Sequence, residues 1–135
     1  MLYEDITKKI LEACFEVSNE LGIGYLESVY ERSLLIALRQ KGLKAENQIP
    51  LQVKFRGEPV GEFFVDILVE DKILIELKVV NALTKEFYAQ TINYLKATGI
   101  EVGLLINFGN TKLEYRRFNN KFIETTNSLK DFFTQ

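Results

Sequence analysis

The segment "VDILVEDKILIELKV", residues 65–79, constrains the fold more than any other part of the chain. Two apolar runs are separated by three polar residues, which is the pattern of two strands joined by a short loop. Asp66, Glu76 and Lys78 interrupt these runs, although burying a charge without a partner costs several kcal/mol. The sequence therefore predicts a central hairpin that carries an unusual charged group.

The length of the loop decides whether the three charges share a face of the sheet. A three-residue loop, 70–72, places Asp66 opposite Glu76, whereas a two-residue loop would pair Asp66 with Ile75. The three-residue loop also sorts the side chains into two faces, with Val65, Ile67, Val69, Ile73, Ile75, Leu77 and Val79 on one and Phe64, Asp66, Leu68, Leu74, Glu76 and Lys78 on the other. A slip by one residue would mix these sets. We therefore predict one site that contains Asp66, Glu76 and Lys78.

The rest of the chain supplies helices and further strands. Apolar positions at helical spacing predict helices over residues 4–21, 26–41 and 84–98, with Thr84 as N-cap of the third and glycines after all three. Strands are expected at 51–57 and 102–108, with a turn over 57–61, a terminal hairpin of 113–118 and 121–125, and a short helix over 127–133. This order predicts one α/β domain, residues 1–135: an antiparallel three-strand meander, a crossover helix and a strand joined in parallel, flanked by helices.

Composition narrows the possible chemistry. The 135 residues contain no histidine and one cysteine, so Ser-His and Cys-His catalysis, HExxH zinc sites and an internal disulfide are excluded, and Cys14 is expected to be a core thiol. Acid–base or metal chemistry must then use carboxylates, lysine, tyrosine, water or backbone. No apolar run is long enough for a membrane span, and an acidic start predicts a cytoplasmic protein. The net charge of −2 argues against strong non-specific nucleic-acid binding and leaves room for a local basic groove.

Two interpretations of the charged group follow from the residues alone. Lys78 can neutralise Glu76 in a cross-strand ion pair, with Asp66 solvated near the strand end. Alternatively, Asp66 and Glu76, with the main-chain carbonyl of Leu77, bind Mg²⁺ or Mn²⁺, which prefer oxygen ligands and retain waters. In that case the Lys78 ammonium stabilises charge on an attacked phosphate or holds the attacking water.

Three motifs carry a resemblance to a known family. Asp66 followed by Glu76-Leu77-Lys78 on the next strand resembles the PD-(D/E)xK nuclease superfamily, which has the restriction-endonuclease-like fold. "GYLESVY", residues 24–30, is similar to the G-x-x-E-x-x-Y signature of a small bacterial and archaeal family within it, and "QTINY", residues 90–94, resembles the Q-x-x-x-Y motif of helicase-associated nucleases. The chain departs from the pattern at Val65, where the superfamily motif has proline.

The resemblance assigns roles to further residues. It implies that Glu27 adds a third carboxylate, directly or through water, with Glu31 as the competing candidate, and that Gln90 orients water or nucleic acid. Each has a simpler alternative: Glu27 stabilises the start of its helix, and Gln90 forms a pair with Tyr94 on the helix surface. Contacts to nucleic acid are expected from Tyr30, Tyr94, Lys85 and Lys96, although Tyr30 also fits a core aromatic.

The resulting functional hypothesis is a metal-dependent nuclease that hydrolyses phosphodiester bonds of nucleic acid, with DNA as the expected substrate. The alternative is a catalytically inactive module of the same fold that binds nucleic acid or a partner protein. Many nucleases of this kind are dimers, so a homodimer that supplies two sites is a further expectation. A small-molecule enzyme has little support, because no glycine-rich phosphate loop is present.

Overall fold

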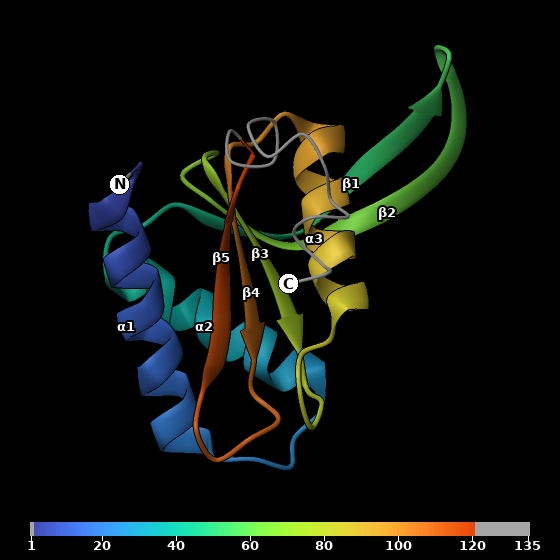
Figure 1. The fold of residues 1–135 in the computed structure, drawn as a ribbon. Helices are drawn as coiled ribbons and strands as arrows, with labels where there is room; N and C mark the ends of the chain where they lie inside the picture. Colours follow the sequence, from blue (N-terminus) through green and yellow to red (C-terminus); the bar gives the residue numbers. More distant parts are fainter. Residues whose placement is uncertain (1, 121–135) are drawn as a thin grey trace.

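The computed structural model describes residues 2–120 as one mixed sheet with helices on both faces (Figure 1). The elements are α1 (Glu4–Leu21), α2 (Glu27–Gln40), β1 (Ala45–Phe55), β2 (Glu58–Val69), β3 (Ile73–Lys78), α3 (Lys85–Thr98), β4 (Val102–Asn107) and β5 (Glu114–Asn119). The strands lie in the order β1-β2-β3-β4-β5, and only β3 and β4 are parallel. This confirms the predicted meander, crossover helix and parallel strand. The strand and helix predicted at 121–125 and 127–133 lie outside the described residues.

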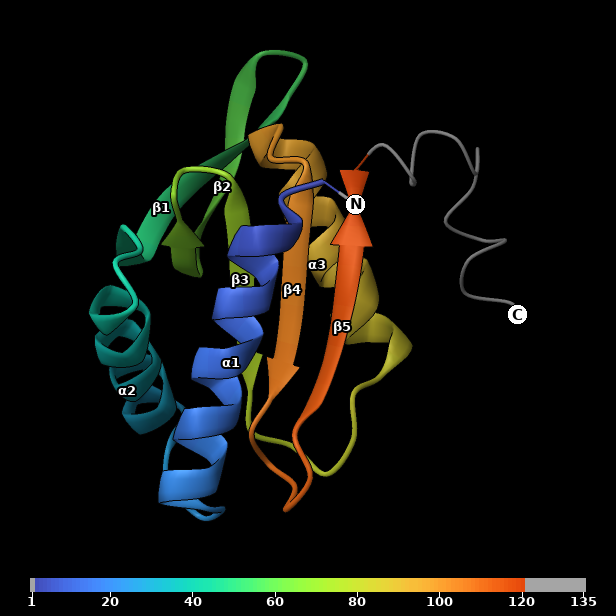
Figure 2. The same cartoon turned by 90° about the vertical axis from the view of Figure 1, so that its left-hand side faces the viewer.

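The sheet separates two hydrophobic cores. Helices α1 and α2 cover one face and α3 covers the other (Figures 1 and 2). The first core, between the sheet and α1 and α2, includes Ile10, Cys14, Leu34, Leu38, Ile75, Leu104 and Phe108. The second core, under α3, is formed by Val65, Leu74, Ile92, Leu95, Leu105 and Phe118. Strands β3 and β4 are therefore buried on both faces, as their continuous apolar sequences predict.

The predicted helix ends agree with the structure. Thr84 occupies the N-cap position of α3, although its side chain makes no capping hydrogen bond. Gly99 ends α3 with a φ of 74°, in the left-handed region where glycine has no steric penalty. None of the three helices in the described part of the chain has the length and apolar character that a bilayer span requires.

The first two strands form a longer hairpin than the sequence indicates. β1 begins at Ala45 instead of residue 51, and the turn contains only Arg56 and Gly57, so the prediction of a turn over 57–61 is wrong. Pro59 lies inside β2. Since β3 pairs with β2 only from Ile67 onward, the outer part of β2 has an open edge, where a residue without an N–H group is tolerated.

The predicted register of β2 and β3 is confirmed, but one side chain is on the other face. Ile67 pairs with Ile75, as a three-residue loop requires. Val65, however, packs in the second core, whereas Ile67 packs in the first. The pairing of β1 with β2 skips Gln48, whose φ of 51° is left-handed. Gln48 lies between the pairs Asn47–Ile67 and Ile49–Val65, so the change of face occurs where Asp66 stands opposite it.

Candidate active site

Two hydrogen bonds from backbone N–H groups to carboxylates connect Asp66 with Glu76 and with Leu77, at the point where β2 separates from β3. The backbone N–H of Asp66 donates to Oε1 of Glu76 over 3.2 Å, and the N–H of Leu77 donates to Oδ2 of Asp66 over 2.7 Å. Each carboxylate thus accepts a bond from the opposite strand, directly beyond the last regular pairs. The predicted placement of Asp66 opposite Glu76 is present in the structure.

Both carboxyl groups are difficult to ionise in the metal-free protein. Burial raises the pKa of Glu76 from its ordinary 4.5 to about 9, and the neighbouring Asp66 charge adds to this rise. Burial also raises the pKa of Asp66, and the hydrogen bond from Leu77 only partly opposes it. Glu76 is 4% exposed, so water does little to stabilise its charge. Two facing acids of this kind favour a cation between them.

Lys78 does not supply that cation as an ion pair. Its Nζ lies 4.9 Å from the centre of the Phe87 ring, and no ion pair within 4.0 Å involves it among residues 2–120. Its charge still lowers the pKa of Glu76 and of Asp66 from a distance. The interpretation as a simple ion pair of Lys78 with Glu76 is therefore not realised in this structure.

Helix α2 brings two more carboxylates toward this pair. Glu31 is buried and accepts hydrogen bonds from Nδ2 of Asn47 at 3.1 Å and from Nε2 of Gln48 at 2.7 Å. The same Gln48 nitrogen lies 3.5 Å from Oδ1 of Asp66. Glu27 is at the first position of α2, and burial followed by repulsion from Asp66 raises its pKa. Both candidates for the third carboxylate thus lie within the electrostatic influence of Asp66.

Gln48 is the residue of this site that sequence reasoning missed. It links Glu31 with Asp66 from β1, in a segment that was not expected to be a strand. Its left-handed backbone conformation is rare for a non-glycine residue. No signal in the sequence marks a glutamine for that conformation.

Helix α3 closes the site on the other side. The Tyr94 hydroxyl shares a hydrogen bond with Gln90, and its pKa is raised by burial and then by the charges of Glu76 and Asp66. The Tyr94 ring stacks on Phe63 of β2, with 3.9 Å between the ring centroids. Gln90 and Tyr94 therefore share a face of α3 that lies toward Asp66 and Glu76. Lys85 and Lys96 are exposed at the two ends of α3.

Tyr30 has a core position. Its side chain is fully buried and stacks on Phe108, with 5.0 Å between the ring centroids. Its hydroxyl donates a 2.6 Å hydrogen bond to the carbonyl of Gly22 and thereby ties the start of α2 to the end of α1. The structure favours the core-aromatic alternative for Tyr30, because a buried ring whose hydroxyl is already bonded is not available to nucleic acid.

A clamp around Asn107 holds the segment that follows Lys78. The buried Asn107 amide accepts hydrogen bonds from the N–H groups of Val80 and Gly109, at 3.0 and 2.9 Å. It donates to the carbonyl of Val80 at 2.9 Å and to Oε1 of Glu114 at 3.0 Å. The Lys78 carbonyl accepts from the N–H of Phe108 at 2.9 Å. These bonds fix the end of the strand that carries Glu76 and Lys78.

Changing Gly109 to alanine is expected to destabilise the fold by about 1–3 kcal/mol. A Cβ at this position would overlap backbone atoms of Val80, which the Asn107 clamp holds in place. Urea unfolding of Gly109→Ala checks the prediction. Gly61→Ala is the matched control, because no atom lies within 4 Å of a Cβ built there. Equal stability of the two variants would contradict the expected overlap.

The donor set fits a hard divalent cation with two carboxylates. Within the described residues no group of three or more histidine, cysteine or acidic side chains is gathered to enclose a metal. Asp66, Glu76 and the Leu77 carbonyl would therefore hold the cation together with water, which suits Mg²⁺ or Mn²⁺.

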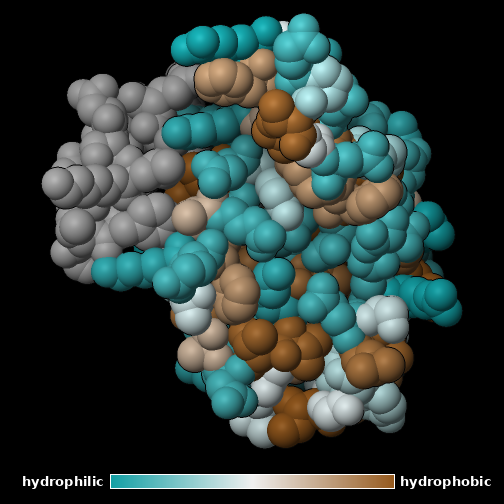
Figure 3. Space-filling view, turned by 90° about the vertical axis from the view of Figure 1, so that its right-hand side faces the viewer, coloured by the Kyte–Doolittle hydropathy of each residue, from teal (hydrophilic) through white to brown (hydrophobic). Residues whose placement is uncertain are grey.

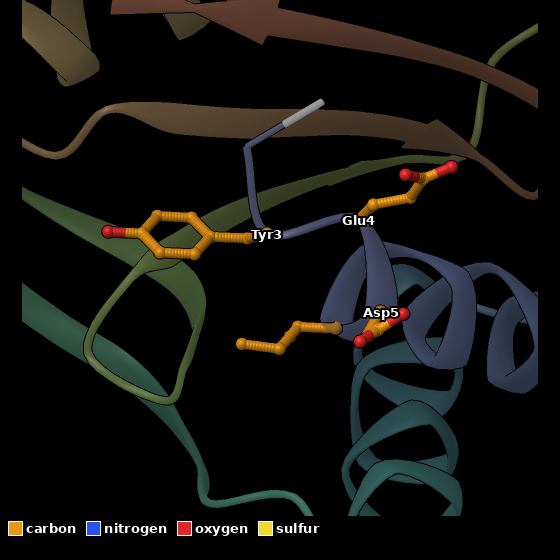
Figure 4. A pocket seen from close by; sticks show the side chains of 4 residues that line it. Tyr3, Glu4 and Asp5 are labelled. Carbon is orange, nitrogen blue, oxygen red and sulfur yellow. The ribbon is translucent and has the colours of Figure 1, made fainter.

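A separate pocket lies at the start of α1. It has a volume of about 440 Å³ and is lined by Tyr3, Glu4, Asp5 and Ile6. Figure 4 shows the side chains of Tyr3 and Glu4 extending in opposite directions, so they do not converge on a common ligand. None of the predicted site residues lines this pocket.

Comparisons with known proteins agree with the fold. A search of curated proteins found no match. A solved structure described as the crystal structure of SSO0001 resembles the chain with a TM-score of 0.59 and 15% identity, over 96% of this chain and 68% of that one. The family model of the PD-(D/E)XK nuclease superfamily matches residues 4–118. The chain thus belongs to the PD-(D/E)XK nuclease superfamily, whose nucleases typically use divalent metal ions.

Proposed function

We propose that the protein is a Mg²⁺- or Mn²⁺-dependent nuclease that hydrolyses phosphodiester bonds of DNA. One observation carries the proposal: the half-buried Asp66 and the buried Glu76 face each other, with raised pKa values and no ion pair to Lys78. Burying such a pair costs stability unless a cation joins it. DNA is the substrate that the restriction-endonuclease-like resemblance implies, and RNA of the same sequence serves as the comparison.

The residues of the chain have distinct roles in this proposal. Asp66 and Glu76 hold the cation with the Leu77 carbonyl, and the bond from the Leu77 N–H to Asp66 orients the first carboxylate. When bound, the cation polarises the phosphate and lowers the pKa of water. Lys78, whose ammonium is not engaged by a carboxylate among the described residues, stabilises negative charge on the phosphate. Gln90 orients the substrate or water from α3.

Changing Asp66 to asparagine is expected to weaken Mn²⁺ binding and DNA cleavage at least about tenfold. Asparagine keeps an oxygen that accepts the Leu77 N–H bond, so the fold should persist, whereas alanine would leave that donor without a partner. Calorimetric Mn²⁺ titration and cleavage of labelled single-stranded, duplex and branched DNA measure both effects.

Glu62→Gln is the matched control, because Glu62 is an exposed carboxylate on the same strand. Cleavage by Asp66→Asn at the wild-type rate would overturn the proposed site. Metal binding without cleavage of any DNA or RNA would favour the inactive module instead.

A further inference from the structure

The outer end of the β1–β2 hairpin, residues 53–60, projects from the body of the domain (Figure 1). We call these residues the hairpin tip. Phe55 and Val60 are 60% and 63% exposed there. Figure 3 views the side from which the hairpin projects and shows hydrophobic groups interrupting a mainly hydrophilic surface. These apolar side chains at the end of a two-stranded ribbon are accessible to a partner.

We propose that the hairpin tip binds an unpaired segment of the nucleic acid substrate, with Phe55 stacking on a base and Arg56 contacting a phosphate. The inference rests on the proposed function, because it takes nucleic acid as the ligand. It goes further by naming the class of substrate: single-stranded or branched nucleic acid.

Phe55 and Arg56 form a paired binding element at the turn. The Arg56 guanidinium carbon lies 4.8 Å from the centre of the Phe55 ring. Both groups are flat: the ring can stack on a base, and the guanidinium can form two hydrogen bonds to a phosphate. Arg56 has a φ of 52° and forms the turn with Gly57, so the two groups are presented together at the outermost point.

The hairpin leads from the tip to the carboxylates. Phe63 lies opposite Leu51 on β1 and stacks on Tyr94. The charges of Glu76 and Asp66 contribute to the raised pKa of the Tyr94 hydroxyl, so Tyr94 lies near them. Between Glu58 and Asp66, β2 spans about 26 Å of extended strand. That distance corresponds to about eight nucleotides at the spacing of one duplex strand, and to fewer in a stretched single strand. A strand of this length reaches from Phe55 to the candidate site.

The charge of the hairpin favours unpaired over paired nucleic acid. The cations Lys54 and Arg56 are offset by Glu58 and Glu62, and the whole chain has a net charge of −2. Duplex binding depends chiefly on neutralised phosphates, for which this surface has few groups. A ring such as Phe55 stacks only on bases that are not enclosed in a duplex, and such stacking tolerates any sequence.

A second copy of the chain fits the tip less well. A stable dimer usually buries about 800 Å² on each partner. The exposed apolar side chains at the tip are Val53, Phe55 and Val60, which together offer far less than that area. A dimer formed through another surface would not conflict with the proposal.

The test measures binding in EDTA, where cleavage does not occur. Fluorescence anisotropy compares a 12-nucleotide single strand, a forked DNA and a 12-base-pair duplex. A fourth probe, a 4-nucleotide strand, is too short to reach from the hairpin tip to Asp66 and Glu76. The longer single strand and the fork should bind more tightly than the duplex. Phe55→Ala should weaken binding to them between about fivefold and a hundredfold, and the 4-nucleotide strand should bind the wild type more weakly than the 12-nucleotide strand.

Two further variants distinguish base stacking by Phe55 from the phosphate contact of Arg56 and from the loss of an exposed aromatic ring elsewhere on the surface. Arg56→Gln should reduce the slope of log affinity against log salt by about 0.7, whereas Phe55→Ala should leave the slope unchanged. Phe15→Ala is the matched control, because Phe15 is 41% exposed on α1, on the other side of the domain (Figure 1). It should bind all four probes like the wild type.

Equal affinity for duplex and single strand, or unchanged binding by Phe55→Ala, overturns the inference. So does light scattering that shows Phe55→Ala converting a dimer into a monomer, because the tip would then be an interface between copies. If the protein cleaves DNA with Mn²⁺ but Phe55→Ala does not change binding, the proposed nuclease function stands and the proposed role of the hairpin tip is wrong. If binding depends on Phe55 but no cleavage occurs, the proposed role of the hairpin tip is supported and the proposed nuclease function is wrong. Failure of all probes to bind in EDTA overturns the inference about the tip, and the nuclease is then decided by the Mn²⁺-dependent cleavage assay alone.

Discussion

Replacing Glu76 by glutamine is expected to stabilise the metal-free protein at pH 9 by on the order of 2–5 kcal/mol. The pKa of Glu76 is about 9 in the folded protein and about 4.5 when the chain is unfolded. Between these values the folded state binds the proton more tightly, so its stability falls as pH rises. The contribution is complete below about pH 4.5 and is lost as pH rises through about 9. Glutamine has no proton to lose, and its side-chain oxygen still accepts the bond from the Asp66 N–H.

Urea unfolding at pH 5, 7 and 9 measures this effect. The wild type should lose stability steadily over this range, and Glu76→Gln should lose less. Added Mn²⁺ should restore the wild type at pH 9 and leave Glu76→Gln unchanged, since a bound cation replaces the proton. Glu62→Gln serves as the control and should follow the wild type. A wild-type stability that rises from pH 5 to pH 9 would refute a protonated Glu76.

Changing Asn107 to alanine is expected to cost about 3 kcal/mol or more of folding stability. The buried amide bonds both backbone groups of Val80 and the N–H of Gly109, and alanine supplies none of these partners. The groups would remain largely shielded from water, which carries a penalty for each of them. Cleavage should fall as well, because the same clamp fixes the segment after Lys78.

Hydrogen exchange locates the effect of Asn107→Ala, since the amides of Val80 and Gly109 should lose protection first. Asn110→Ala is the control. Asn110 donates one bond, to the carbonyl of Asn81 at 2.8 Å, so its loss should cost about 1 kcal/mol or less. If both variants unfold at the same urea concentration, Asn107 does not act as a clamp.

The pairing of Asp66 with Glu76 could be predicted because a register slip would have exposed apolar side chains of the central hairpin. The loop itself satisfies this register: Glu70 and Asp71 have φ values of 53° and 55°, and the Lys72 N–H bonds the Val69 carbonyl at 2.9 Å. The pattern of buried residues therefore determined the geometry of the central pair of strands. Helical spacing, four residues apart, placed Gln90 and Tyr94 on one face of α3.

The errors concern places where backbone conformation overrides the pattern. A run with two glycines and Pro59 resembles a turn, yet an open strand edge allows it to continue as a strand. Val65 changes face next to the position where Gln48 adopts a left-handed conformation, which no sequence rule assigns to glutamine. Tyr30 fitted two roles in the sequence, and its hydrogen bond to Gly22 was needed to favour one.

The bond from the Leu77 N–H to Asp66 bears on which of the two acids indicates that a related protein is still an active enzyme. Because this carboxylate completes the backbone ladder where two strands part, a descendant that had lost cleavage would still gain from keeping it. Glu76 is the opposite case, since its burial weakens the metal-free fold. Selection for folding alone would keep a hydrogen-bond acceptor at residue 66, as aspartate or asparagine, and would replace Glu76 by a side chain that cannot ionise. A relative that keeps an acid at the second position is therefore the better candidate for a working enzyme.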